Sequence, residues 1–172
     1  MTTYASETPT FTSVKRRAVG RLHHKRLSMR TEELFLSVEV VWKDEHMLKV
    51  EVTASNAFFR CTTRVYDTSE SLIGLANQLV AFPIEKDSLF YQIGEKDSYA
   101  YCSFRFYPIS DYGLVGIHIQ LEENVSTVYR EEEKSKLSLE LLLESQSIDI
   151  FSKQLQSVAS RQSGKAILEG RG

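Results

Sequence analysis

Apolar side chains recur at every second position once the chain passes residue 33. In the stretch 34–43 every even-numbered residue is apolar: Leu34, Leu36, Val38, Val40 and Trp42. Successive side chains on a strand point to opposite faces, so this stretch predicts a strand with Trp42 toward the core. The same alternation in 48–54 and 58–66 predicts two further antiparallel strands, and in the second of them it turns Phe59 and Cys61 inward.

The spacing then changes to that of an amphipathic helix. A stripe at intervals of three and four residues comprises Leu72, Leu75, Ala76, Leu79 and Val80. The sequence Asp67-Thr68-Ser69-Glu70 before it is typical of a helix start, and Phe82-Pro83 after it is typical of a helix end. We therefore expect a helix that runs to about Ala81.

Alternation returns in the second half of the chain and predicts four more strands. Their residues are 89–93, 99–107, 114–122 and 137–143. The charged stretch 122–136 before the last strand predicts a long solvated loop. A closing helix is expected from a cap at Ser147 to a stop near Gly164, with one apolar stripe: Ile148, Phe151, Leu155 and Val158.

These elements predict an α+β fold of two layers, with about seven mainly antiparallel strands and two helices packed on one face of the sheet. We expect residues 31–164 to form this single domain. The polar, aperiodic start predicts a basic, disordered arm over residues 1–30, and the stretch 165–172 is expected to be a flexible tail.

Several of these positions resemble a family of small bacterial α+β domains of unknown function. They are the stretch 59–66, the helix positions Leu72, Leu75, Ala76 and Leu79, then Phe82-Pro83, Phe104 and Phe106, and the late strand and helix. Some sequences similar in this way resemble immunity proteins of toxin systems. The resemblance covers residues 34–162 and implies a fold, but it transfers no catalytic or binding residue.

Charge is distributed unevenly along the 172 residues. Residues 1–30 hold seven of the 21 Lys and Arg residues and one of the 23 acidic residues, so the arm carries +6 and the rest −8. Three interpretations of residues 14–30 stay open: contact with nucleic acid or another acidic surface, a targeting peptide, or no function. Translation from Met29 would remove this arm.

Two cysteines are too few for a disulfide scaffold, and no apolar run is long enough to span a bilayer. We therefore expect a cytoplasmic protein without membrane contact. Cys61 and Cys102 fall on apolar strand faces, which favours core thiols over a nucleophile. His118 stands alone on a strand, and the glycines form no phosphate-binding loop, so no cofactor, metal or catalytic residue is predicted.

Strand parity collects Tyr and Arg side chains on the solvent side of the predicted sheet. The predicted protein-binding residues are Arg60, Arg64, Tyr66, Tyr99, Tyr101, Arg105, Tyr107 and His118. Tyr and Arg are enriched at binding hot spots, although aromatic residues also favour exposed strands. A protein-binding module is the leading interpretation. A nucleic-acid binder that uses residues 14–30 and an enzyme with a pocket built from loops remain alternatives, and the oligomeric state is left open.

Overall fold

The computed structural model describes residues 33–82, 88–110, 113–124 and 134–171. The predicted arm over residues 1–30 lies outside this part of the chain, and so does most of the predicted loop over 122–136. The described elements, in chain order, are β1 (Leu34–Lys43), β2 (Leu48–Asn56), β3 (Arg60–Asp67), α1 (Ser69–Ala81), β4 (Leu89–Gly94), β5 (Ala100–Pro108), β6 (Leu114–Asn124), β7 (Lys134–Glu144), α2 (Ser145–Arg161) and β8 (Gly164–Glu169).

The predicted α+β class with antiparallel strands and two helices is confirmed, but the strands form two sheets instead of one. The first sheet has the order β3-β2-β1-β8 and the second has the order β4-β5-β6-β7. Every pair of neighbouring strands is antiparallel. The break falls at α1, because this helix carries the chain from the edge of one sheet to the edge of the other.

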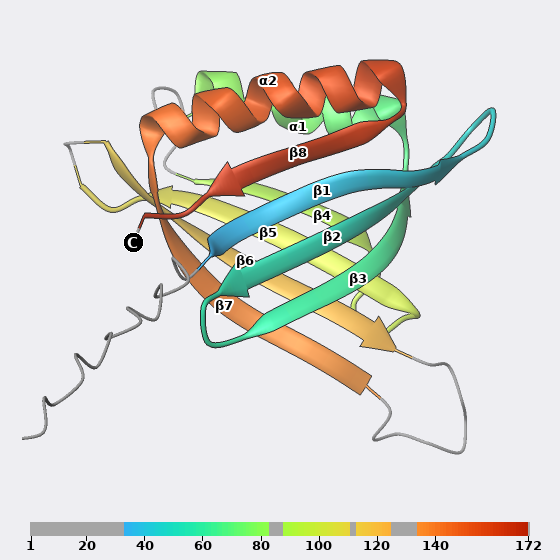
Figure 1. The fold of residues 1–172 in the computed structure, drawn as a ribbon, viewed down its shortest axis with the longest axis horizontal. Helices are drawn as coiled ribbons and strands as arrows, with labels where there is room; N and C mark the ends of the chain where they lie inside the picture. The colour runs from blue at the N-terminus through green and yellow to red at the C-terminus, as the bar shows by residue number, and fades with distance from the viewer. Residues whose placement is uncertain (1–32, 83–87, 111–112, 125–133, 172) are drawn as a thin grey trace, which may run out of the picture.

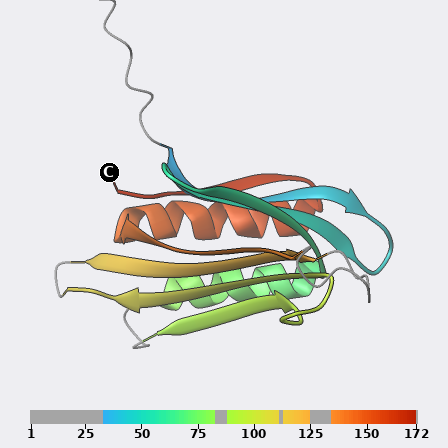
Figure 2. The ribbon, with the colours of Figure 1, turned by 90° about the horizontal axis from the view of Figure 1, so that it is seen from below.

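The two sheets lie face to face (Figure 1). The sheets are separated along one side, and the two helices cover the core there. β3 lies against β4, β5 and β6, which joins one edge of the first sheet to the second sheet. At the opposite edge α2 packs on β8, and α1 packs on α2. Figure 2 shows the sheets as separate layers with α2 at the level between them.

On each strand the alternate apolar side chains face this shared core. Phe104, Phe106 and Phe151 are among the largest fully buried side chains, and α1 adds Leu72, Leu75, Ala76 and Leu79. Burying a Leu or Phe side chain contributes about 1.5–3 kcal/mol relative to leaving it exposed, so these residues dominate the stabilisation. The alternation in β2, β5, β6 and β7 was therefore interpreted correctly.

The expected flexible tail is wrong, because residues 164–169 form the eighth strand. β8 pairs with β1 from Phe35↔Glu169 to Val40↔Gly164. Beyond it the N–H of Gly170 donates to the carbonyl of Leu34 at 2.7 Å, and the N–H of Arg171 donates to the carbonyl of Leu142 at 2.7 Å. The end of the described chain thus ties β1 of the first sheet to β7 of the second.

The two helices differ in how well sequence predicts their ends. Thr68 caps α1 by accepting a hydrogen bond from the N–H of Ser71 at 3.1 Å, as the capping sequence predicts. The predicted cap at Ser147 is wrong, because α2 begins at Ser145 directly after β7. The Ser145 hydroxyl donates to the carbonyl of Gly113 at 3.0 Å, and this bond attaches the helix start to the beginning of β6.

A β-bulge reverses the predicted direction of Trp42. The β1–β2 register shifts between Val40 and Trp42, so that Val40 pairs with Val50 and Trp42 pairs with Lys49. The extra residue, Val41, moves all later side chains of β1 to the opposite face. Trp42 consequently faces outward and is 49% exposed.

Candidate functional site

The residues predicted as one binding face lie on two faces that point away from each other. Arg60, Arg64 and Tyr66 lie on β3 and face outward from the first sheet. Arg105, Tyr107 and His118 lie on β5 and β6 and face outward from the second sheet. Because both sheets turn their inner faces to one core, the structure does not bring the two groups together.

The two other predicted residues are placed differently from expectation. Tyr99 precedes β5 in a turn and is 68% exposed. Tyr101 has the outward parity, yet it is only 5% exposed and is therefore not available as a surface hot spot.

Aromatic side chains gather at one end of the first sheet's outer face. The rings of Trp42 and Tyr66 meet edge to face, with centroids 6.4 Å apart. The Lys49 ammonium lies 5.5 Å from the centroid of the Tyr66 ring. Tyr66 is 51% exposed, so this group, which we call the aromatic patch, offers a large and partly preorganised apolar surface beside a cation.

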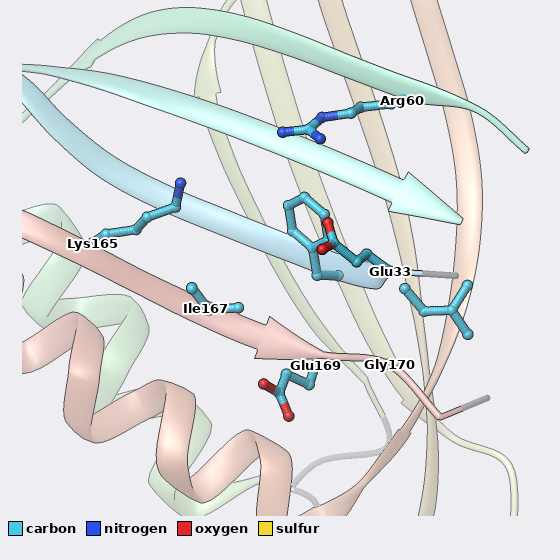
Figure 3. Close-up of a pocket in the computed structure, with 8 residues that line it drawn as sticks. Glu33, Arg60, Lys165, Ile167, Glu169 and Gly170 are labelled. Carbon is cyan, nitrogen blue, oxygen red and sulfur yellow. The ribbon is translucent and has the colours of Figure 1, made fainter. Parts of the chain in front are cut away.

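A hollow of about 520 Å³ lies on the same outer face. Phe35 and Ile167 line it with apolar groups, and Arg60, Lys165, Glu33 and Glu169 line it with charged ones. Arg60 comes from β3, whereas Lys165, Ile167 and Glu169 come from β8, so the hollow spans the width of the sheet (Figure 3). The Arg60 guanidinium lies 5.3 Å from the centroid of the Phe35 ring.

Paired charges border the hollow on the side of the aromatic patch. Lys165 contacts Glu39 at 3.2 Å, and Arg64 contacts Glu51 at 2.9 Å, in one row across the first sheet. Such exposed pairs contribute little stability.

Short polar side chains lie beside this row. Ser37 and Thr53 share the outer face, yet they are 1% and 5% exposed. Longer neighbouring side chains therefore cover Ser37 and Thr53 and make the outer face uneven.

The turn between β2 and β3 adds two exposed aromatic side chains. Phe58 is 82% exposed and Phe59 is 65% exposed, whereas alternation predicted Phe59 inside. The Asn56 side chain accepts hydrogen bonds from the N–H groups of both residues, at 3.3 Å and 2.9 Å. Ala57 adopts a φ of 73°. β3 therefore starts at Arg60, two residues later than predicted, so Phe58 and Phe59 belong to the turn.

On the second sheet the outward polar side chains bind one another. The Tyr107 hydroxyl donates to Glu140, and its ring lies over Gly116, where an added Cβ would meet ring atoms at 2.6 Å. Burial, followed by the bond to Glu140, raises the pKa of Tyr107 to about 12. His118 Nε2 and the Ser138 hydroxyl are 2.8 Å apart.

A polar corner closes one end of this face. The Glu122 carboxylate, only 6% exposed, accepts from the N–H of Asp97 at 3.0 Å and contacts the Lys136 ammonium at 3.3 Å. The hydrogen bond with Lys136 is also the main reason that the pKa of Asp97 is lowered. These contacts hold the β4–β5 turn against β6 and β7, which is a structural role.

Burial raises the pKa of both thiols, and Cys102 is fully buried whereas Cys61 is half-buried. Raised pKa values disfavour the reactive thiolate. Within the described ranges no group of three or more His, Cys, Asp or Glu side chains could hold a metal ion. Nor does any described helix have the length and apolar character to cross a membrane.

Sequence reasoning turned Trp42 and Phe59 inward, and it placed Phe35 and Phe58 on the outer face without including them among the predicted binding residues. The uninterrupted apolar run Val40-Val41-Trp42 is the signal that could have revealed the bulge, because strict alternation cannot continue through it. Comparison with known proteins adds no residue to these, since no protein-family model, curated protein or solved structure matches the chain.

Proposed function

We propose that this protein is a non-catalytic protein-binding module that meets its partner with the outer face of the first sheet. The observation that supports this proposal is that the aromatic patch and the hollow are both exposed on the same face of one sheet. Large aromatic side chains lose little conformational entropy on binding, and aromatic and Arg side chains are the residue types found at hot spots.

The chemistry of the hollow indicates what the partner offers. Its apolar lining suits an apolar side chain, and its rim carries Arg60 and Lys165 together with Glu33 and Glu169. A matching protein surface would place one apolar side chain in the hollow and charged groups of both signs around it. The resemblance to immunity proteins makes a protein toxin one candidate class of partner.

The proposal is tested by affinity capture with three baits: the natural chain, Trp42→Ala and Phe90→Ala. Phe90 is a matched control because it is 57% exposed on the second sheet, against 49% for Trp42. A partner captured by the natural chain and by Phe90→Ala, but lost with Trp42→Ala, supports the proposal. Loss with Phe90→Ala alone would move the interface to the second sheet.

A further inference from the structure

The outer edges of the two sheets differ in how they are protected. The N–H of Arg64 on β3 donates to the Glu123 carboxylate at 3.2 Å, and the N–H of Ile167 on β8 donates to the Gln154 side chain at 2.7 Å. An edge strand with unpaired backbone groups is a template for another strand, so these side chains block pairing on both edges of the first sheet.

Strand β7 forms an eleven-residue edge of the second sheet. The N–H of Asn124 donates to Tyr99 and the N–H of Ile109 donates to Leu114, so even-numbered residues of β6 bond toward β5. Odd-numbered residues of β6 must then bond toward β7, because the two sides of an antiparallel strand alternate. In the register Ile119↔Leu139, the even-numbered residues of β7 direct their backbone groups away from the sheet.

Among the described residues, only Leu142 on this edge has a backbone partner, the N–H of Arg171. The backbone groups of Lys136, Ser138 and Glu140 have no hydrogen-bond partner in the described part of the chain. β4 at the other edge is also uncovered there, but it has only six residues. Short edges are poor templates, which leaves β7 as the better one.

The sequence of β7 complements itself when two copies run antiparallel. If Ser138 faces Ser138 of a second copy, then Lys136 faces Glu140 of that copy, and Glu140 faces its Lys136. On the inner side the same register sets Leu137 against Leu139. The outward backbone groups of Lys136, Ser138 and Glu140 pair with those of the second copy. Lys136, which also contacts Asp97 and Glu122, and Glu140, which also accepts from Tyr107, each meet an opposite charge of that copy, and apolar side chains meet on the core side.

We propose that this chain forms a symmetric dimer in which β7 of two copies pair antiparallel about Ser138 and join the second sheets into one continuous sheet. This interface is independent of the outer face of the first sheet. β2, which leads into the exposed β2–β3 turn, contacts β7.

The dimer is tested by sedimentation velocity on the full chain over a concentration series, beside Ser138→Pro and Gln92→Pro. Proline removes an N–H that points away from β6, so Ser138→Pro should abolish the dimer while the circular dichroism spectrum stays native. Gln92→Pro makes the same change on the edge of β4 and should leave the dimer intact. A natural chain that sediments as a monomer at every concentration, or a dimer lost only with Gln92→Pro, would overturn the proposal.

The register is tested with Ser138→Cys and Glu140→Cys under oxidising conditions. Facing residues of a hydrogen-bonded pair have Cα atoms about 5.5 Å apart, within reach of a disulfide. Ser138→Cys should therefore give a covalent dimer on a non-reducing gel, whereas Glu140→Cys and the natural chain should not. Cross-linking through Glu140→Cys but not Ser138→Cys would contradict the register. Glu140→Lys places like charges opposite each other and should raise the dimer Kd about tenfold.

Discussion

The outer faces of the two sheets carry similar residue types but hold them in different ways. On the second sheet Tyr107 bonds to Glu140, His118 contacts Ser138 and Tyr101 is buried. On the first sheet Trp42 and Tyr66 stay about half-exposed, and Arg60 lines an open hollow. The presence of Tyr and Arg on a strand therefore does not define a binding face, because what matters is whether neighbouring side chains already bind them.

The strongest test of the self-bound second face is Gly116→Val. The added side chain would occupy the position of the Tyr107 ring, which lies 2.6 Å from the ideal Cβ. Overpacking of this kind costs about 1–3 kcal/mol, so thermal unfolding should show a clearly lower Tm. Gly74→Ala is the control: nothing lies within 4 Å of its Cβ, and a helical Ala should stabilise the protein by about 0.5–1 kcal/mol. An unchanged Tm for Gly116→Val would show that the Tyr107 ring is not held against this position.

A smaller effect is expected in the titration of Tyr107. Its pKa in the folded protein is about 12, against about 10 for an unperturbed Tyr. Because the folded value is the higher one, the stabilisation is complete below about pH 10 and is lost as the pH rises through about 12.

Phenolate absorbance of the natural chain, minus that of Tyr107→Phe, isolates this group. Glu140→Gln should lower the pKa only in part, because burial is the larger cause of the shift. Titration of Tyr107 at an ordinary pKa in the natural chain would contradict the account.

The smallest expected change is in the fluorescence of Trp42, the single Trp of the chain. Being 49% exposed, its indole should be accessible to acrylamide in the free protein, and bound partner should reduce this quenching. Quenching that is weak in the free protein would mean that Trp42 faces the core, as simple alternation predicts.

Most of the fold could be predicted from periodicity, because buried strand faces leave a regular mark in the sequence. Three predicted inward residues of β5, Cys102, Phe104 and Phe106, are fully buried, and Ala100 is partly buried. The division into two sheets could not be predicted, because the alternation of apolar and polar residues in a strand is the same whether its sheet has four or eight strands. β8 was missed because six residues with two buried side chains resemble a loose tail.

The candidate site was less predictable than the core. One extra residue, Val41, reverses Trp42, and alternation cannot register such a bulge. The partners that bind the Tyr and Arg side chains come from other strands, as Glu140 of β7 does for Tyr107. Sequence parity gives the direction of a side chain but not what it contacts there.

The central claim is that the first sheet's outer face, and not the second's, meets the partner. Arg60→Ala and Arg105→Ala test it with a matched pair, since each guanidinium lies over a neighbouring ring, at 5.3 Å from Phe35 and 5.4 Å from Tyr107. Calorimetric titration with the captured partner should show a Kd raised about tenfold or more for Arg60→Ala, as expected for a hot-spot Arg, and an unchanged Kd for Arg105→Ala. The reverse result, weaker binding only with Arg105→Ala, would contradict the account.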